Sequence, residues 1–181
     1  MNRTRASRSP AIFPDYRAGA EPVGHAANCY DALRAAAKEW FVERIRESFD
    51  RQGFMRTLGA VLESVEPGTV TISCGFTEAL TQQHGLLHGG VVASIIDVAC
   101  GYAALSKMPP DREVLTVEFK VHFLKPAKTE RVIAVGQVVQ SGRTLTVCEG
   151  SVFDHTRRRL LARMTATMMA VDATAGAGAT G

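Results

Sequence analysis

The sequence predicts an α+β fold in which a curved antiparallel sheet is wound around one long central helix. Three observations lead to this prediction. Residues 90–106 form a helix-length segment that is apolar on nearly every face. Two strand-like runs precede this segment, and a series of long alternating runs follows it. Since a fully apolar helix must be covered by other structure, the economical packing wraps the sheet around it.

The length and composition are those of one globular domain. The chain has 181 residues, of which 46% are apolar and 22% are charged. Its net charge of +3 is too small to indicate a nucleic-acid-binding surface. Residues 90–106 are too few for a membrane span and contain Asp97, so we expect no membrane span. The four cysteines lie far apart without metal-ligand spacing, which predicts reduced thiols and no metal site.

The two ends of the chain differ from the middle in composition. Residues 1–27 are predicted to be a flexible N-terminal segment, and residues 173–181, which contain only Ala, Gly and Thr, a disordered tail. The first segment carries four arginines and lacks the apolar centre of a secretory signal. An organellar transit peptide and an arginine-rich bacterial terminus share this composition. We favour the second interpretation and expect a cytoplasmic protein.

The first predicted element is an extra N-terminal helix within residues 28–53. Apolar side chains recur at helical spacing from Asp31 to Arg51, with Arg and Glu between them. Its Trp and Phe side chains are more typical of packing than of a cofactor site. The helix precedes the main domain, residues 54–172, and would either cover a pocket of that domain or pad a subunit interface.

The main domain opens with a predicted hairpin and the apolar helix. Residues 58–65 and 69–76 have strand-like patterns, and Glu66-Pro67-Gly68 between them is a turn sequence. A loop over residues 77–87 leads to a helix from about residue 89 to about residue 106, which Met108-Pro109-Pro110 ends.

Long strands are predicted for the second half. Residues 117–123 alternate between apolar and polar side chains until Pro126 stops the run. Three further strands are expected over residues 132–139, 144–153 and 160–171, separated by turn sequences. We expect these strands to form an antiparallel meander.

Asp97 is the first candidate for chemistry, because it is the one residue in the apolar helix that is charged at neutral pH. A carboxylate there loses hydration, which is tolerated where the group is hydrogen-bonded or reactive. At the start of the same helix, Gly89 and Gly90 let backbone N–H groups approach a ligand, and the helix dipole favours negative charge there. The plain alternative is a structural Asp97 satisfied by N–H groups, although a helix interior leaves few free donors.

Gly89 and Asp97 cannot act on one carbonyl group within a single chain. They are eight residues apart, which places them roughly 12 Å apart along a helix axis. If they cooperate, a second copy of the helix must run antiparallel to the first, so that Gly89 of one chain meets Asp97 of the other. The spacing therefore predicts a homodimer with composite sites.

The motif Gln82-x-x-Gly85-x-x-His88-Gly89-Gly90, followed by Asp97 and by the run from Thr116 to Ala127, resembles the hotdog-fold thioesterases of the phenylacetate-degradation type. The similarity extends from about Phe54 to about Val171. It implies a sheet wrapped around a long helix, the hotdog fold. It also implies hydrolysis of acyl-CoA thioesters with medium-chain or aromatic acyl groups, no cofactor other than the coenzyme A of the substrate, and a dimer that pairs into a dimer of dimers.

The resemblance also implies roles for single residues. Gly89 would be the backbone oxyanion donor, and Asp97 of the partner chain the nucleophile or the general base. Gln82 would orient the thioester or the water, since an amide both donates and accepts. Thr116 stands where relatives have Ser or Thr near the carboxylate. His88 is a candidate base, but a histidine at a helix start often caps the turn, and we place that structural role first.

Substrate contacts are expected from the helix start and from a basic turn. Gly90 is the candidate at the helix start, and Arg157 and Arg158 are the candidates for the coenzyme A phosphates. Lys120, Lys125, Lys128 and Arg143 are further possible phosphate ligands, although most basic residues are expected to be solvated surface. Cys100 is expected to be buried filler, because an apolar helix does not stabilise a thiolate.

Two other functions stay open. A hydratase or dehydratase on the same fold would use a histidine with a carboxylate, and a non-catalytic acyl-CoA-binding module would have lost turnover. The spacing from Gln82 to Asp97 favours hydrolysis over hydration. A pure binder gains nothing from burying Asp97, which disfavours the second alternative.

Overall fold

The computed structural model describes residues 25–173, with side chains at Asp31 and from residue 39 onward. Almost all of the predicted flexible segment and of the predicted tail therefore lies outside the described residues. The chain divides into two units, Met1–Arg34 and Ala35–Gly181. The second unit holds the sheet, the central helix and the C-terminal part of the first helix.

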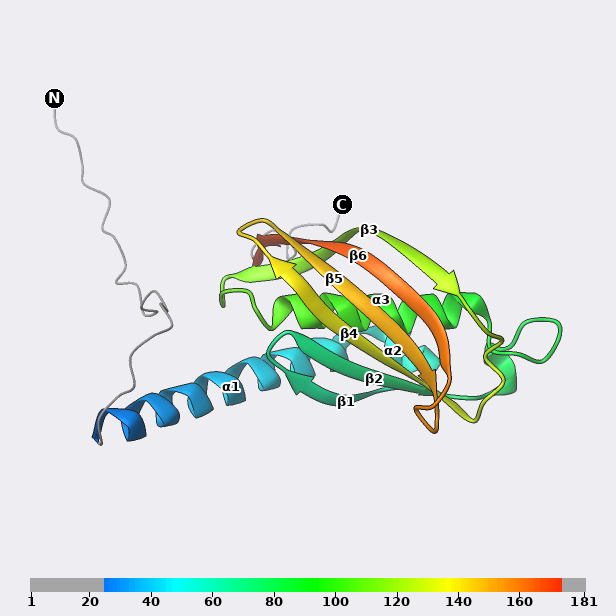
Figure 1. The fold of residues 1–181 in the computed structure, drawn as a ribbon, viewed down its shortest axis with the longest axis horizontal. Helices are drawn as coiled ribbons and strands as arrows, with labels where there is room; N and C mark the ends of the chain where they lie inside the picture. Colours follow the sequence, from blue (N-terminus) through cyan, green and yellow to red (C-terminus); the bar gives the residue numbers. More distant parts are fainter. Residues whose placement is uncertain (1–24, 174–181) are drawn as a thin grey trace, which may run out of the picture. The chain divides into compact units, whose positions relative to one another are not determined.

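Six antiparallel strands form one sheet, as the α+β prediction requires (Figure 1). The strands are β1 (Ala60–Glu66), β2 (Thr69–Gly75), β3 (Arg112–Phe123), β4 (Arg131–Ser141), β5 (Leu145–Asp154) and β6 (Leu160–Asp172). Their order in the sheet is β1-β2-β4-β5-β6-β3. The predicted hairpin is confirmed as β1 paired with β2, and β4, β5 and β6 form the predicted meander.

The position of β3 differs from the meander expected from chain order. β3 pairs with β6 rather than with β4, for example through Phe119 opposite Ala166. The reason is that the central helix α3 (Gly89–Leu105) lies between β2 and β3 in the chain. The chain crosses the sheet along this helix, so β3 begins at the far edge. One long edge of β3 consequently has no strand beside it in the described part of the chain.

The central helix lies against the sheet at close range. Gly136 on β4 and Gly150 on β5 face each other in the strand register beneath this helix. A Cβ atom at Gly136 would lie 2.3 Å from the carbonyl carbon of Ala99, and one at Gly150 would lie 2.5 Å from Cγ1 of Ile96. The two glycines therefore let α3 approach the sheet more closely than any side chain would allow.

One stripe of α3 is not covered by the sheet. Ala93, Ser94, Asp97 and Val98 are half-buried, and Gly90 is exposed, whereas most other positions of the helix are buried. The expectation of a helix covered on nearly every face is thus wrong along this stripe, at the spacing of one helical face. The stripe contains the suspected carboxylate and otherwise mostly small side chains.

The first helix, α1 (His25–Arg51), is followed by a short helix that the sequence did not predict, α2 (Gly53–Leu58). Leu58, expected to start a strand, ends α2 and is buried with Met55. Six residues are too few for a periodic pattern to separate a helix turn from a strand start. α1 also begins at His25, before the predicted boundary at residue 28.

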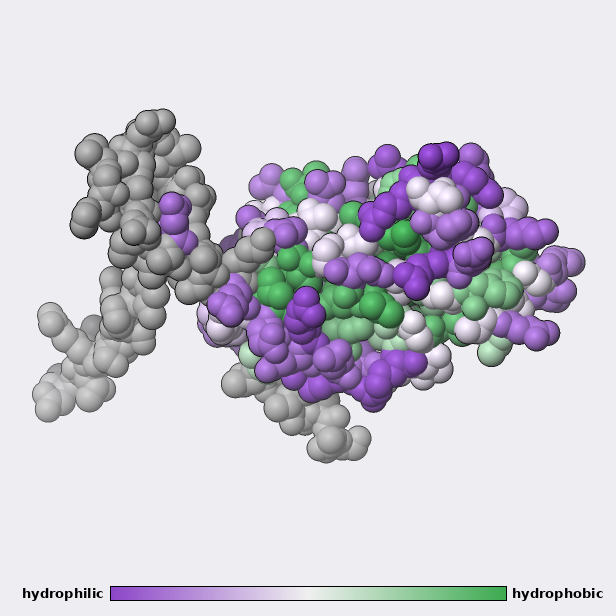
Figure 2. Space-filling model, turned by 90° about the horizontal axis from the view of Figure 1, so that it is seen from below, coloured by the Kyte–Doolittle hydropathy of each residue, from purple (hydrophilic) through white to green (hydrophobic). Residues whose placement is uncertain are grey.

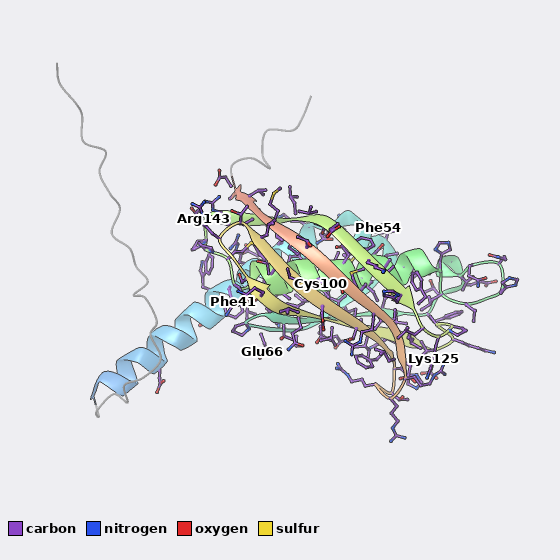
Figure 3. The ribbon with its side chains drawn as sticks, turned by 45° about the horizontal axis from the view of Figure 1, so that its top comes forward. Phe41, Phe54, Glu66, Cys100, Lys125 and Arg143 are labelled. Atoms are coloured by element: carbon purple, nitrogen blue, oxygen red, sulfur yellow. The ribbon has the colours of Figure 1, made fainter. Side chains whose placement is uncertain are left out.

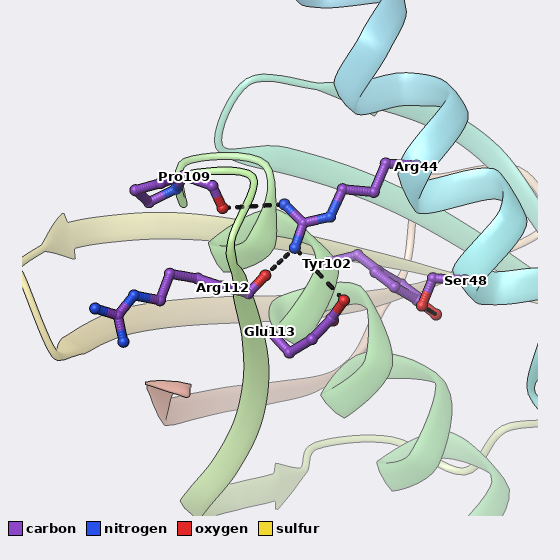
Figure 4. Close-up of polar contacts among 6 residues, drawn as sticks. All are labelled: Arg44, Ser48, Tyr102, Pro109, Arg112 and Glu113. Carbon is purple, nitrogen blue, oxygen red and sulfur yellow. Dashed lines mark hydrogen bonds and ion pairs between the residues drawn. The ribbon is translucent and has the colours of Figure 1, made fainter. Parts of the chain in front are cut away.

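The C-terminal turns of α1 are bound to the loop and strand that follow α3. Ile45 and Phe49 are buried in the core. The Arg44 guanidinium donates to the carbonyl oxygens of Pro109 and Arg112 and pairs with Glu113 at 3.5 Å (Figure 4). Trp40, expected to pack, is instead 47% exposed. These contacts fix the end of α1 relative to α3 and β3.

Hydrophobic side chains also remain on the surface. Figure 2 shows apolar side chains gathered between hydrophilic margins on one face of the molecule. Several of the exposed large hydrophobic residues lie on the edge strand β3 or directly after it: Leu115, Val117, Phe119, Phe123 and Leu124. Exposed apolar side chains along an unpaired strand edge mark a surface that another chain can cover.

Candidate active site

The start of α3 is capped by His88, which leaves one N–H group free. Nδ1 of His88 accepts a hydrogen bond of 2.9 Å from the Gly90 N–H, and the His88 carbonyl accepts from Val91 at 3.0 Å. The Gly89 N–H has no acceptor among the described residues. A free N–H at the positive end of a helix dipole is suited to an oxyanion. The cap is the structural role expected for His88.

The loop before α3 brings Gln82 to the same place. The loop closes on itself through a 2.8 Å bond from the Gln82 N–H to the Leu86 carbonyl, and Gly85 adopts φ +70°, which favours glycine. Oε1 of Gln82 accepts from the His84 N–H. This bond orients the side-chain amide and leaves its NH2 group able to donate.

Gln82 and Gly89 line one pocket of about 360 Å³. Phe123 and Lys125 contribute to its wall, and the other lining residues are Leu86, Leu87, Val92, Leu124, Pro126, Ala127 and Leu161. A Cβ atom at Gly89 would lie 3.3 Å from the Phe123 ring. A side chain at position 89 would therefore press against this ring.

Asp97 lies in a different environment, next to β3. The Thr116 hydroxyl donates a 2.9 Å hydrogen bond to Oδ1 of Asp97, and no cationic group pairs with this carboxylate in the described part of the chain. Burial raises the pKa of Asp97 above its ordinary value, and the bond from Thr116 opposes this rise. A half-buried carboxylate with one hydroxyl donor retains basicity for a reaction.

The pocket of Asp97 is separate from that of Gly89. Its volume is about 230 Å³, and it is lined by Gln52, Asp97, Val98, Gly101, Tyr102, Val114, Leu115 and Thr116. None of these residues lines the pocket of Gln82 and Gly89. One chain thus brings Gln82 to Gly89 and Thr116 to Asp97, but it does not bring the two pairs together.

The cysteines with described side chains are poor nucleophiles. Cys74, Cys100 and Cys148 are buried and free. Burial raises the pKa of Cys148 to about 11 and raises that of Cys100 as well, with further increases from Cys148 and Asp97. Among residues 25–173, no group of three His, Cys, Asp or Glu side chains could hold a metal ion.

The basic turn between β5 and β6 lies at the end of the sheet that carries Lys125. Oδ1 of Asp154 accepts from the N–H groups of Arg158 and Arg159, each at 3.1 Å, and Arg157 has a positive φ of 58°. The turn leads to Leu161, whose carbonyl accepts from the Lys125 N–H at 3.2 Å. Arg143, in contrast, lies at the opposite end of the sheet (Figure 3), so it does not join this basic group.

Sequence reasoning missed several residues around Asp97. Gln52, Gly101, Tyr102 and Val114 surround the carboxylate pocket, although they come from three segments that are distant in sequence. No motif marks them, because their proximity arises from the way Gln52, α3 and β3 pack together.

Comparison with known proteins shows which family this chain resembles. Residues 84–161 match the thioesterase superfamily. A crystal structure of a thioesterase family protein from Silicibacter pomeroyi is 48% identical, with a TM-score of 0.70, and covers 73% of this chain and 98% of that one. The 1,4-dihydroxy-2-naphthoyl-CoA hydrolase of Listeria monocytogenes is 29% identical over 60% of this chain and 88% of its own length.

The fold is also shared with a protein from a phenylacetic acid degradation operon. The E. coli PaaI structure has a TM-score of 0.69 at 18% identity and covers 75% of this chain and 96% of that one. Within the described residues, no helix is both long and apolar enough to cross a membrane.

Proposed function

The chain belongs to the thioesterase superfamily and has its hotdog fold, and from this premise we propose that it hydrolyses acyl-CoA thioesters to a free acid and coenzyme A. The observation that carries this proposal is the half-buried Asp97, which has Thr116 as its hydrogen-bond donor and no cationic partner among the described residues. The free N–H of Gly89 supplies the second requirement, a donor for the oxyanion.

A homodimer would unite the two pockets. In an antiparallel pair of α3 helices, the Gly89 end of one helix lies beside Asp97 of the other. The uncovered stripe of α3, with Ala93 and Ser94 beside Asp97, supports close helix pairing there. The free, apolar edge of β3 supports the same association. The dimer would hold two equivalent sites, each made by both chains.

Association of two such dimers is supported by a second apolar row. Leu115, Met169 and Leu145 are aligned across β3, β6 and β5. The hydroxyl of Thr116 points to Asp97, and side chains alternate along a strand, so the side chain of the neighbouring Leu115 points to the opposite face of the sheet. Leu115 is 55% exposed and Leu145 is 49% exposed. This outer surface suits a contact between dimers.

The reaction follows from the composite geometry. The thioester carbonyl oxygen accepts from the Gly89 N–H of one chain, and the Gln82 amide of that chain orients the thioester or the water. Asp97 of the other chain then either attacks the carbonyl carbon to give an anhydride, which water hydrolyses, or takes a proton from the attacking water. In both routes the C–S bond breaks, one water molecule is consumed to form the free acid, and the coenzyme A sulfur receives a proton.

Coenzyme A would extend toward the basic end of the sheet. Lys125 lines the Gly89 pocket, and the turn of Arg157 and Arg158 lies next to the same segment of β6. We infer that these cations meet phosphate groups, to which guanidinium groups bind well. Gly90, next to the oxyanion donor, would contact the substrate through its backbone.

The geometry supports hydrolysis over the hydratase alternative. Nδ1 of His88 is engaged by the Gly90 N–H, so this ring serves the helix cap.

Acyl-CoA esters are made inside cells, which supports the cytoplasmic location expected from the sequence.

A panel of acyl-CoA thioesters, from acetyl to dodecanoyl and including benzoyl and phenylacetyl esters, tests the proposal. Release of free thiol, followed with a thiol reagent, is expected for medium-chain or aromatic members. Tight binding of the panel without thiol release would instead make the protein a non-catalytic acyl-CoA-binding module.

A further inference from the structure

We propose that the Asp97 pocket holds the acyl group of the substrate, that Gly101 sets the length of this group, and that Gln52 recognises a hydrogen-bond donor at its far end. This inference rests on the proposed hydrolysis, because it assumes that the carbonyl carbon lies next to Asp97. It gives Gln52, the residue between α1 and α2, a part in substrate selection.

The pocket extends from Asp97 along α3 by about one turn. Gly101 is four residues after Asp97 and therefore roughly 6 Å further along the helix axis. Val98 and Val114 also line this pocket and give it apolar walls. A volume of about 230 Å³ accommodates one substituted ring or a chain of a few carbon atoms rather than a long alkyl chain.

Gly101 leaves space that the protein does not fill. A Cβ atom added at this position would meet only Cγ1 of Val114, at 4.0 Å. This differs from Gly136, where a Cβ atom would overlap the backbone of α3. Packing of the helix against the sheet therefore does not require glycine at position 101. The space beside it is available to an acyl group.

The far end of the pocket is polar. Nε2 of Gln52 donates a 2.7 Å hydrogen bond to the Tyr102 hydroxyl, which in turn donates to Oγ of Ser48 at 3.2 Å. Figure 4 shows Ser48 and Tyr102 adjacent, where α1 meets α3. Burial raises the pKa of Tyr102, so its hydroxyl stays neutral. Both the donor and the acceptor capacity of this hydroxyl are thus used within the protein.

The side-chain oxygen of Gln52 is free to accept a hydrogen bond from a ligand. Its Nε2 is engaged by Tyr102, while its Oε1 has no hydrogen-bond donor among the described residues. The Arg44 contacts to the loop after α3 hold the end of α1 in place. An acceptor fixed in this way at the end of an apolar pocket selects an acyl group that ends in a hydroxyl or another donor.

Two substrate comparisons test the two assignments. The first compares 4-hydroxybenzoyl-CoA with 4-methylbenzoyl-CoA, which has the same shape without the donor. We expect wild-type kcat/KM to favour the hydroxyl compound by about tenfold, and Gln52→Leu to abolish this preference. Gln140→Leu, at an exposed position on β4, is the matched control and should retain it.

The second comparison uses acetyl-CoA and octanoyl-CoA with Gly101→Ala and Gly101→Val. Progressive filling of the pocket should lower kcat/KM for octanoyl-CoA by about tenfold or more in the valine variant, with acetyl-CoA little changed. Thermal melting confirms that both variants fold, and the alanine variant keeps the test valid if the valine variant does not.

The outcomes separate this inference from the proposed function. The pocket assignment is overturned if the wild type hydrolyses the esters but the Gly101 variants and Gln52→Leu affect every substrate equally. The proposed hydrolase function would stand in that case. Absence of thiol release from every ester overturns the proposed function, and this assignment with it.

Discussion

Gly89 and Asp97 lie eight residues apart on α3 and line two separate pockets of the same chain. The first has the free backbone donor and the second the carboxylate. A rigid helix cannot close a separation of roughly 12 Å. The proposed chemistry therefore depends on a second chain.

Asp97→Asn should lower kcat by about a hundredfold or more, with little change in substrate binding, because the amide keeps the shape but has no basicity. Single-turnover thiol release and a binding titration with a non-hydrolysable acyl-CoA analogue measure the two effects. The variant should be at least as stable as the wild type at neutral pH. The raised pKa of Asp97 means that its folded environment disfavours the charged form. Near-normal turnover would remove Asp97 from the mechanism.

Gln82→Ala should cost less, about tenfold in kcat/KM, because an orienting hydrogen bond is one of several contributions. Steady-state kinetics on the best ester of the panel measures the loss. Gln83→Ala, at the exposed neighbouring position, is the control and should be close to wild type. A loss as large as that of Asp97→Asn would make Gln82 essential.

The pH profile should report the environment of Asp97. Activity requires the carboxylate, so kcat/KM should fall as the pH decreases through its raised pKa. Thr116→Val removes the hydrogen bond that lowers this pKa, so the acidic limb of the profile should move to higher pH. Thr165→Val, an exposed position on β6, serves as the control. An unchanged limb in Thr116→Val would show that a different group controls the profile.

Gly136→Ala should destabilise the fold by about 3 kcal/mol, because the added methyl group would lie 2.3 Å from backbone atoms of α3. Neither the helix backbone nor the central strand can move easily. Gly75→Ala is the matched control on β2, since nothing lies within 4 Å of its Cβ position. Denaturant unfolding of both variants measures the difference, and equal stabilities would contradict the close packing of α3 on β4.

Much of this fold could be predicted from the sequence, because α3 and the long strands have strong local patterns. The order of the strands could not, since the place of β3 beside β6 depends on the path of α3 across the sheet. Asp97 was identifiable as a charge in an apolar helix, and Gly89 by its place at the helix start. Gln52 and Tyr102 carry no such signal, because their contact joins residues 50 positions apart. The uncovered stripe on α3 was also hidden, since its mostly small and apolar residues have the composition of a buried face.

The composite site is tested most directly by mixing two inactive proteins. One carries Asp97→Asn, and the other carries Gly89→Phe, whose side chain would collide with the Phe123 ring that lies 3.3 Å from the Cβ position. In a mixed dimer both lesions fall into one site and the other site is intact. Complete exchange of equal amounts should restore about a quarter of the wild-type activity, since half of the dimers are mixed and each has one intact site. If subunit exchange is verified by mass-tagged chains and no activity returns, or if the active protein sediments as a monomer, the shared site is wrong.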